Sequence, residues 1–261
     1  MQAIYNRIGM SYDSTRKADP NIVVKLLNHL SPKKNCSYLD IGCGSGNYTH
    51  AVFNKGFKIS GIDISEEMLR KARNKNSDID WTLGDAESMP FSSNSFHGGI
   101  CILATHHIRD INTAFKEIFR VINEGKFVIF TSFPEQMQNY WLHHYFPKMM
   151  KKAQQAMLSF EKISIALLNA GFQNVIHDKF FVTNELEDWF LQSGKYRPHI
   201  YLDEQIRNGI SSFALEENQQ EINDGCEKLE EDIQSGEVNK IIRSYENDQG
   251  DYAFVICNIS T

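Results

Sequence analysis

The sequence predicts an α/β fold with a mostly parallel sheet that helices cover on both faces. Between residues 36 and 133, nearly continuous apolar segments alternate with amphipathic helical segments, a pattern typical of parallel strands in a doubly wound sheet. Three clustered glycines follow the first apolar segment, and after residue 133 the alternation gives way to a longer helical pattern. We therefore expect one sheet-based core with helical insertions.

In the first half, each strand is predicted from a short apolar run and each helix from apolar residues on one face. The predicted strands cover 36–41, 57–62, 79–84, 96–104 and 126–132. A helix over 47–55 ends before Gly56, since glycine terminates helices well. Ser65 is a good N-cap for the next helix because its hydroxyl accepts hydrogen bonds from backbone amides. A third helix covers 111–122, where the apolar residues share one face.

The second half adds two strands and the segments that we expect to form a cap. A helix over 160–170 and strands over 174–183 and 252–259 extend the sheet to seven strands. Within a long helical insertion over about 184–248, four apolar residues are spaced by 4, 3 and 4, so the acidic residues between them form the outer face of a helix. The predicted core comprises 1–133, 160–183 and 250–261, and the predicted cap comprises 134–159 and 184–249.

Charge argues against a nucleic-acid partner. The net charge of the 261 residues is −6. The stretch from Glu216 to Asp232 has eight acidic residues and one lysine, which is −7, so the rest of the chain is close to neutral at +1. A duplex-binding protein usually has a basic face. The basic cluster that we find is Lys148, Lys151 and Lys152, and we interpret it as a solvated helix face.

Hydrophobicity and cysteine spacing bear on location. No apolar run approaches the roughly 20 residues that a membrane helix needs, and the first residues lack the apolar stretch of a signal peptide. The five cysteines are scattered without a CxxC pair, which suits reduced thiols and gives no zinc site. We expect a cytoplasmic protein without a membrane partner or a bound metal, and the sequence gives no oligomeric state.

The glycine loop DIGCGSG (40–46) is the strongest functional signal, because it lies directly after a strand and before a helix. Glycines there allow a tight turn and let the backbone touch a ligand. In an open α/β sheet the ligand lies beyond the carboxyl ends of the strands. The dinucleotide fingerprint GxGxxG would need a glycine in place of Asn47. The loop therefore suits a nucleoside ligand without a pyrophosphate.

Two further carboxylates, Asp63 and Asp85, stand at the ends of the second and third predicted strands. At the position of Asp63, an acidic side chain can accept hydrogen bonds from both hydroxyls of a ribose. Asp85 could meet the amino group of an adenine. Each residue alone could equally be a turn or cap residue, but together with the glycine loop they predict a nucleoside site.

These segments together resemble the class I S-adenosylmethionine-dependent methyltransferases, and most closely the branch around the ubiquinone/menaquinone biosynthesis methyltransferases (methyltransferase type 11). The matching segments are LDIGCGSG (39–46), GIDISEEMLRKAR (61–73), GDAESMPF (84–91), ATHHI (104–108) and FKEIFRVI (115–122). The resemblance implies a Rossmann-like, seven-stranded sheet whose last strand is antiparallel. It also implies S-adenosylmethionine as the cofactor.

The resemblance implies roles for individual residues around the cofactor. The loop glycines would line its methionine and ribose parts, Asp63 would bind the ribose, and the side chains after the second strand would hold the adenine. The implied cofactor-binding residues are Asp40, Gly42, Cys43, Gly44, Gly46, Asp63, Ile64, Met68, Asp85 and Ala86. In similar proteins an N-terminal segment closes over the cofactor, which here points to Tyr5, Tyr12 and Arg16. Arg16 could pair with the carboxylate of the cofactor or be a structural residue.

The methyl acceptor is expected beyond the end of the fourth strand, beside His106 and His107. A histidine there could take a proton from a phenol or an acidic carbon, or it could belong to a hydrogen-bonded scaffold. The segment YWLHHYFP (140–147) could form a lid over an apolar acceptor or pack within the cap. The predicted substrate contacts in it are Tyr140, Trp141, His144 and Tyr145. Further candidates for the pocket wall are Trp189, Phe190, Tyr196, Arg197 and Tyr201.

The predicted function is S-adenosylmethionine-dependent transfer of a methyl group, by in-line displacement, to a small apolar or aromatic molecule. The segment ATHH (104–107) lacks the Asn/Asp-Pro-Pro-aromatic pattern expected of enzymes that methylate the amino groups of nucleic-acid bases. Two alternatives stay open. One is methylation of a protein or an RNA, and the other is a regulatory protein that binds the cofactor without catalysis.

Overall fold

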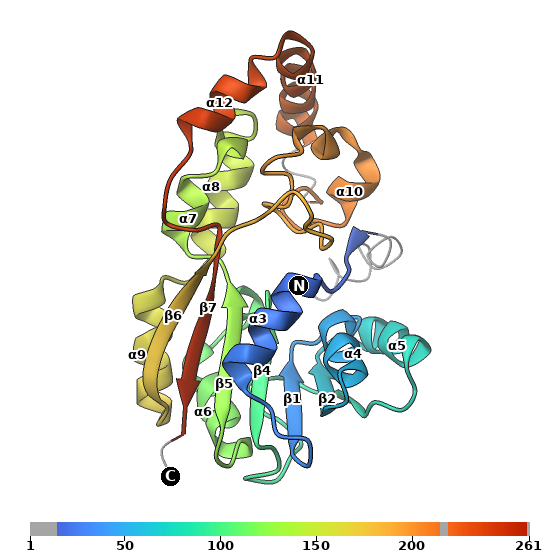
Figure 1. The fold of residues 1–261 in the computed structure, drawn as a ribbon, viewed down its shortest axis with the longest axis vertical. Coiled ribbons are helices and arrows are strands. Elements are labelled where there is room, and N and C mark those ends of the chain that lie inside the picture. Colours follow the sequence, from blue (N-terminus) through green and yellow to red (C-terminus); the bar gives the residue numbers. More distant parts are fainter. Residues whose placement is uncertain (1–14, 215–218, 260–261) are drawn as a thin grey trace.

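The computed structural model describes residues 15–214 and 219–259. Its sheet has seven strands in the order β3-β2-β1-β4-β5-β7-β6 (Figure 1). β7 runs antiparallel to both of its neighbours, β5 and β6. The predicted Rossmann-like sheet with an antiparallel last strand is therefore confirmed. The strands are β1 Ser37–Ile41, β2 Lys58–Asp63, β3 Trp81–Leu83, β4 Gly98–Ile102, β5 Lys126–Thr131, β6 Gln173–Phe180 and β7 Tyr252–Asn258.

Alternate residues of the strands pack against helices on opposite faces of the sheet. Phe127 and Ile129 of β5 share a hydrophobic cluster with α6 and α9, whereas Val128 and Phe130 share another with α3 and α4. Successive side chains of a strand point to opposite faces, so this sheet is covered on both. The helices of the core are α3 Pro20–Leu30, α4 Asn47–Asn54, α5 Glu66–Lys75, α6 Ile111–Val121 and α9 Phe160–Ala170.

Capping residues explain where several of these helices begin and end. Ser65 caps α5, and Gly171, with a φ of 113°, ends α9, as the sequence predicts. Helix α3 is absent from the predicted elements. Its start is nevertheless marked in the sequence, because the Asp19 carboxylate accepts hydrogen bonds from the first helix amides and Pro20 occupies the first turn.

Three strands are shorter than predicted by two residues or more. β4 ends at Ile102 because Leu103 has a φ of 52°, in the left-handed region that interrupts a ladder. β6 ends at Phe180, and its pairing with β7 is irregular near Asn174, which also has a φ of 52°. β3 has three residues, at the edge of the sheet.

The helices of the insertions stand beyond the end of the sheet at which β5 leads into α7 (Figure 1). The predicted helix with an acidic outer face is α11, which buries Ile222 and Leu229. The stretch 184–209 is less helical than predicted, because turns interrupt it around Gly194 and Gly209. The elements of the cap are α7 Pro134–Gln138, η2 Trp141–His144, α8 Pro147–Ala156, η3 Pro198–Leu202, α10 Glu204–Asn208, α11 Gln219–Ser235 and α12 Val238–Ser244.

The cap has a hydrophobic core of its own. Tyr140, Trp141 and Tyr145 are each at most 3% exposed and share a cluster with Tyr201. The hydroxyls of Tyr140 and Tyr201 lie 2.7 Å apart, and the Trp141 indole N–H donates to the carbonyl of Lys195 at 3.2 Å. These contacts join η2 to η3 and to the turn before it.

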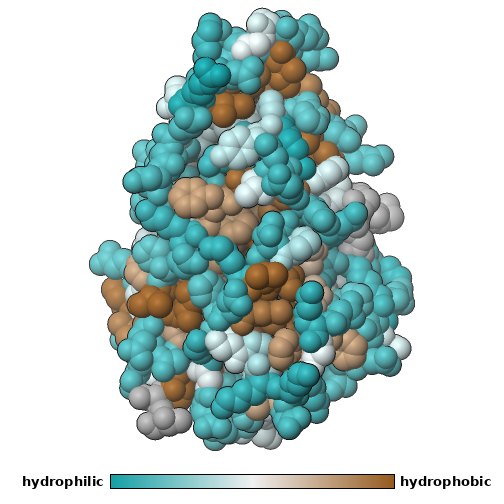
Figure 2. Space-filling view, in the orientation of Figure 1, coloured by the Kyte–Doolittle hydropathy of each residue, from teal (hydrophilic) through white to brown (hydrophobic). Residues whose placement is uncertain are grey.

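Apolar side chains are dispersed over one face of the molecule (Figure 2). On the face shown in Figure 2, hydrophilic side chains cover most of the molecule and apolar ones form separate small groups. Of the helices in the described residues, none is long and apolar enough to cross a membrane.

Candidate cofactor and acceptor site

A cavity of about 640 Å³ lies between the carboxyl ends of the strands and the cap. Its core side is lined by the glycine loop, the ends of β2 and β4 and the turn after β3. Its cap side is lined by α8 and by residues 190–191 and 209–212. A cavity of this size is in the range that encloses a small organic ligand.

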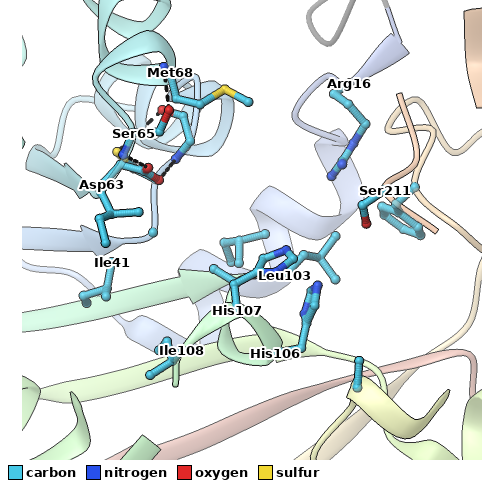
Figure 3. Close-up of a pocket in the computed structure, with 18 of the residues that line it drawn as sticks. Arg16, Ile41, Asp63, Ser65, Met68, Leu103, His106, His107, Ile108 and Ser211 are labelled. Atoms are coloured by element: carbon cyan, nitrogen blue, oxygen red, sulfur yellow. Dashed lines mark hydrogen bonds between the residues drawn. The ribbon is translucent and has the colours of Figure 1, made fainter. Parts of the chain in front are cut away.

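Asp63 connects the glycine loop to the start of α5. Its Oδ2 accepts a hydrogen bond from the Gly44 amide at 2.8 Å, and its Oδ1 accepts one from the Ser65 amide at 2.8 Å (Figure 3). Burial raises the pKa of Asp63, and the amide donors oppose that shift. Since each carboxylate oxygen can accept a second hydrogen bond, Asp63 retains acceptor capacity for a ribose.

The loop glycines serve two purposes. Gly42, Gly44 and Gly46 all have a positive φ, which favours glycine. A Cβ on Gly42 would stand 2.6 Å from Ala104, and one on Gly46 would stand 2.3 Å from Trp81, so packing requires both glycines. At Gly44 no described atom lies within 4 Å of the Cβ position. Gly44 thus borders open space in the cavity.

Asp40 is 2% exposed and lines the cavity. Its Oδ2 accepts a hydrogen bond from the Thr49 hydroxyl at 2.6 Å, while its Oδ1 has no partner in the described part of the chain. Burial raises the pKa of Asp40 to about 7. A buried carboxylate oxygen beside the loop fits the cationic amino group of S-adenosylmethionine, which would stabilise the charged carboxylate.

Asp85 and Ala86 line the cavity, as do Cys43, Ile64 and Met68. Asp85 accepts a hydrogen bond from Arg109 at 3.1 Å. The Arg109 side chain is 71% exposed, and ion pairs at the surface contribute little energy. An adenine amino group could therefore compete for this carboxylate.

Arg16 lines the cavity but pairs with a residue of the protein. Its Nε and Nη2 donate to the carboxylate of Asp188 at 2.6 and 3.3 Å, and the Tyr48 hydroxyl donates to the same carboxylate at 3.0 Å. This pairing corresponds to the structural role that the sequence left open for Arg16, beside a contact with the carboxylate of the cofactor. The expected residues Tyr5 and Tyr12 lie outside the described residues.

His106 and His107 lie on η1 (Thr105–His107), directly after β4, at the wall of the cavity (Figure 3). Their ring centroids are 3.8 Å apart, and Nδ1 of His106 is buried without a partner among the described residues. Burial lowers the pKa of His107 to about 4 and, aided by the charges of His107 and Arg16, holds the pKa of His106 well below its usual range. Both imidazoles are therefore neutral at pH 7, and a neutral imidazole can accept a hydrogen bond at one nitrogen.

The expected aromatic lid does not face this cavity. The cavity is lined by residues other than Tyr140, Trp141, His144 and Tyr145. The three aromatic residues lie in the core of the cap, as does Tyr201, whereas Phe190 lines the cavity. Burying a large apolar side chain contributes roughly 1.5–3 kcal/mol, which favours the packing alternative that the sequence left open.

One face of α8 forms much of the cap wall, and sequence reasoning missed it. Met149, Lys152, Ala153 and Ala156 all line the cavity. Their spacing of i, i+3, i+4 and i+7 places them on one face of a helix. That periodicity is visible in the sequence, and these four residues could have been identified from it. Lys152 thus lies at the edge of the cavity as well as on an exposed helix surface.

Comparisons with known proteins agree with this site. The methyltransferase domain family Methyltransf_11 matches residues 39–130. A crystal structure of a candidate methyltransferase from an antibiotic biosynthesis pathway of Anabaena variabilis ATCC 29413 is 32% identical, with a TM-score of 0.84 over 93% of this chain and 98% of that one. The chain belongs to the S-adenosylmethionine-dependent methyltransferases. S-adenosylmethionine is therefore its cofactor, as the motifs imply.

Curated relatives of this methyltransferase match its core. Malonyl-acyl-carrier-protein O-methyltransferase of Pseudescherichia vulneris is 29% identical over 130 residues, which are 50% of this chain and 52% of the relative. The ubiquinone/menaquinone biosynthesis C-methyltransferase UbiE of Rickettsia prowazekii is 37% identical over 110 residues, which are 37% of this chain and 44% of the relative. The chain thus spans about half the length of the curated relatives it matches.

Proposed function

We propose that this methyltransferase methylates a small apolar or aromatic molecule that binds between the core and the cap. The observation that carries the proposal is the continuity of the cavity, which joins the glycine loop and its neighbouring carboxylates to an apolar cap wall. The volume of about 640 Å³ suits small ligands better than a macromolecular surface.

In this proposal the polar end of the cavity holds the cofactor. Asp40 receives its amino group, Asp63 its ribose hydroxyls, and Ile64 and Met68 flank its adenine, with Asp85 near the adenine amino group. When bound, the cofactor supplies a methyl group on a cationic sulfur that leaves as a neutral thioether. The remaining task of the protein is to align the acceptor atom and to exclude water.

His106 and His107 are the proposed contacts to the acceptor. Where the acceptor is a hydroxyl group, an imidazole nitrogen of His106 or His107 would accept the proton that the hydroxyl loses on methylation. Because the pKa of His107 is about 4, such an imidazole is a weak base.

The names of the curated relatives support a small or carrier-linked acceptor. One relative methylates an oxygen of a malonyl group on an acyl-carrier protein, and another methylates a carbon in quinone biosynthesis. Oxygen and carbon acceptors both fit two neutral histidines.

The test is formation of S-adenosylhomocysteine from S-adenosylmethionine in the presence of a panel of phenols, acidic carbon compounds and apolar carboxylic acids. We expect turnover with at least one class, and His106→Ala should lower kcat roughly 100-fold. His144→Ala, outside the cavity, should leave kcat unchanged. Cofactor binding without turnover on any class would contradict the proposal, and transfer to protein or RNA would favour that alternative.

A further inference from the structure

We propose that the α8 face with Met149, Ala153 and Ala156, together with Met137 and Ile210, is the acceptor-binding surface. We infer that it takes an apolar ring whose hydroxyl group points at His106. This inference rests on the proposed function, since it names the chemistry of the molecule to be methylated.

The shape of this surface follows from its side chains. Met137 and Met149 are 3% and 1% exposed and come from two different helices, α7 and α8. Ala153 and Ala156 stand on the same face of α8 as Met149 and leave room, because each has a single methyl group. The flexible side chain of methionine adapts to ligands of different shape. This wall can therefore pack against a flat ring without a rigid, preformed pocket.

The two ends of the cavity differ in the polarity of the residues that line them. Asp40, Asp63, Asp85 and Glu87 line its core end. On the cap side, the lining residues between 137 and 157 and between 190 and 212 are mostly apolar, with Lys152, Ser211 and Ser212 as the polar ones. Asp188, which also lines the cavity, is paired with Arg16. The cofactor carries the polar groups that suit the first end, whereas the second end suits an uncharged, apolar body.

His106 stands where the two ends meet. Figure 3 shows it between Asp63 and Met68 on one side and Arg16 and Ser211 on the other. Its buried Nδ1 has no partner among the described residues. In the tautomer with the proton on Nε2, Nδ1 accepts a hydrogen bond. A hydroxyl group on the acceptor would supply that donor and hold the oxygen at the junction with the cofactor.

Two probes with the same ring system, 2-naphthol and naphthalene, test this inference. Each is titrated into the full chain saturated with S-adenosylhomocysteine, and binding is followed by fluorescence. We expect 2-naphthol to bind about 5- to 10-fold more tightly than naphthalene, the scale of one hydrogen bond. His106→Leu should bring the two affinities together, and His106→Asn, which keeps a hydrogen-bonding group, should restore part of the difference. Equal affinities in the unaltered protein would overturn the inferred hydroxyl contact.

Variants of α8 test the surface itself. Ala153→Trp should weaken binding of both probes at least 10-fold and leave the affinity for S-adenosylhomocysteine within twofold. Ala156→Trp, at an exposed position, provides a second variant that does not depend on repacking the cap. The matched control is Gln155→Trp, on the exposed side of α8 and outside the cavity lining.

Different outcomes bear on the acceptor surface and on the proposed function. Unchanged probe binding in both alanine variants would overturn the acceptor surface. Failure of the unaltered protein to bind S-adenosylhomocysteine would instead contradict the proposed function. Tight probe binding that the alanine variants abolish and Gln155→Trp preserves is the result we expect.

Discussion

At the scale of the residue, Asp40 links burial to ligand binding. Its pKa of about 7 reflects the cost of burying its charge, and the cationic amino group of S-adenosylmethionine would favour the ionised form. We therefore predict that the affinity for S-adenosylmethionine rises with pH up to about 7 and falls by up to about tenfold per pH unit below it. Calorimetric titrations between pH 5.5 and 8 measure this dependence. Asp40→Asn should flatten it, and an affinity independent of pH in the unaltered protein would contradict the role of Asp40.

The same residue predicts how stability varies with pH in the absence of ligand. A carboxyl group whose folded pKa is raised stabilises the folded state fully below its ordinary pKa, and this contribution is lost as pH rises through the folded pKa. For Asp40 the window runs from about 4 to about 7. Urea unfolding should show less loss of stability across this window for Asp40→Asn than for the unaltered protein. Parallel curves would show that Asp40 is charged in the folded state throughout.

Asp63 should contribute directly to cofactor affinity. We predict that Asp63→Ala weakens S-adenosylmethionine binding by roughly 1–3 kcal/mol, the scale of a lost hydrogen bond to a charged group. Asp78→Ala, at an exposed position near the start of β3, is the control. Circular dichroism checks folding and calorimetry gives the affinity. Unchanged affinity in a folded variant would remove Asp63 from the site.

Sequence reasoning at this scale succeeds where a contact is local. The glycine loop and Asp63 belong to one strand-turn-helix segment with its neighbouring strand, and their spacing is visible in the sequence. Asp188 is not identified from the sequence because its partner Arg16 is 172 positions away, and no local motif marks Asp188.

At the scale of the element, the N-terminal segment joins the cap to the core. The Trp189 amide donates to the carbonyl of Thr15 at 3.1 Å, and the Glu187 amide donates to Asp19 at 3.0 Å. Between them, the 1% exposed carboxylate of Asp188 receives Arg16 and the Tyr48 hydroxyl of α4. One short segment of the insertion thus contacts both the N-terminal segment and the helix that follows the glycine loop.

We predict that Asp188→Asn lowers the free energy of unfolding by about 2–3 kcal/mol, because charge-assisted hydrogen bonds to a buried carboxylate are lost. The affinity for S-adenosylmethionine should fall as well, since Arg16 and Tyr48 line the cavity. Urea unfolding and calorimetry measure the two effects. Glu187→Gln, at an exposed neighbouring position, should change neither. If Asp188→Asn also changes neither, this contact between segments does not support the site.

Helices and strands with a regular pattern of apolar residues could be predicted from the sequence, whereas segments without such a pattern could not. α11 was found from its 4, 3, 4 spacing, and the strands of the core from their apolar runs. The stretch 184–209 was not, because its turns and short helices are stabilised by contacts with distant segments. The shorter β4 depends on the left-handed backbone of Leu103, which no sequence pattern indicates.

At the scale of the whole molecule, topology collects the site. Strands β1, β2 and β4 are parallel. The carboxyl ends of these strands therefore bring Asp40, Asp63 and His106 together at the same end of the sheet. The cap covers that end and supplies the apolar wall. This arrangement gives one cavity a polar end for the cofactor and a more apolar end for the acceptor that we propose.

The packing of side chains inside the cap could not be predicted from the sequence. The aromatic segment 140–147 suggested a lid, but its rings pack against residues as distant as Tyr201, 61 positions beyond Tyr140. Whether a ring faces a cavity or a core is decided by such long-range packing, which composition alone does not determine.

Binding of S-adenosylmethionine in the cavity can be measured by calorimetric titration of the full chain with S-adenosylmethionine and, separately, with NAD. We predict saturable binding of S-adenosylmethionine and none of NAD, because the loop lacks the third glycine of the dinucleotide fingerprint at Asn47. Binding of NAD, or no binding of S-adenosylmethionine by folded protein freed of carried-over ligand, would contradict the account.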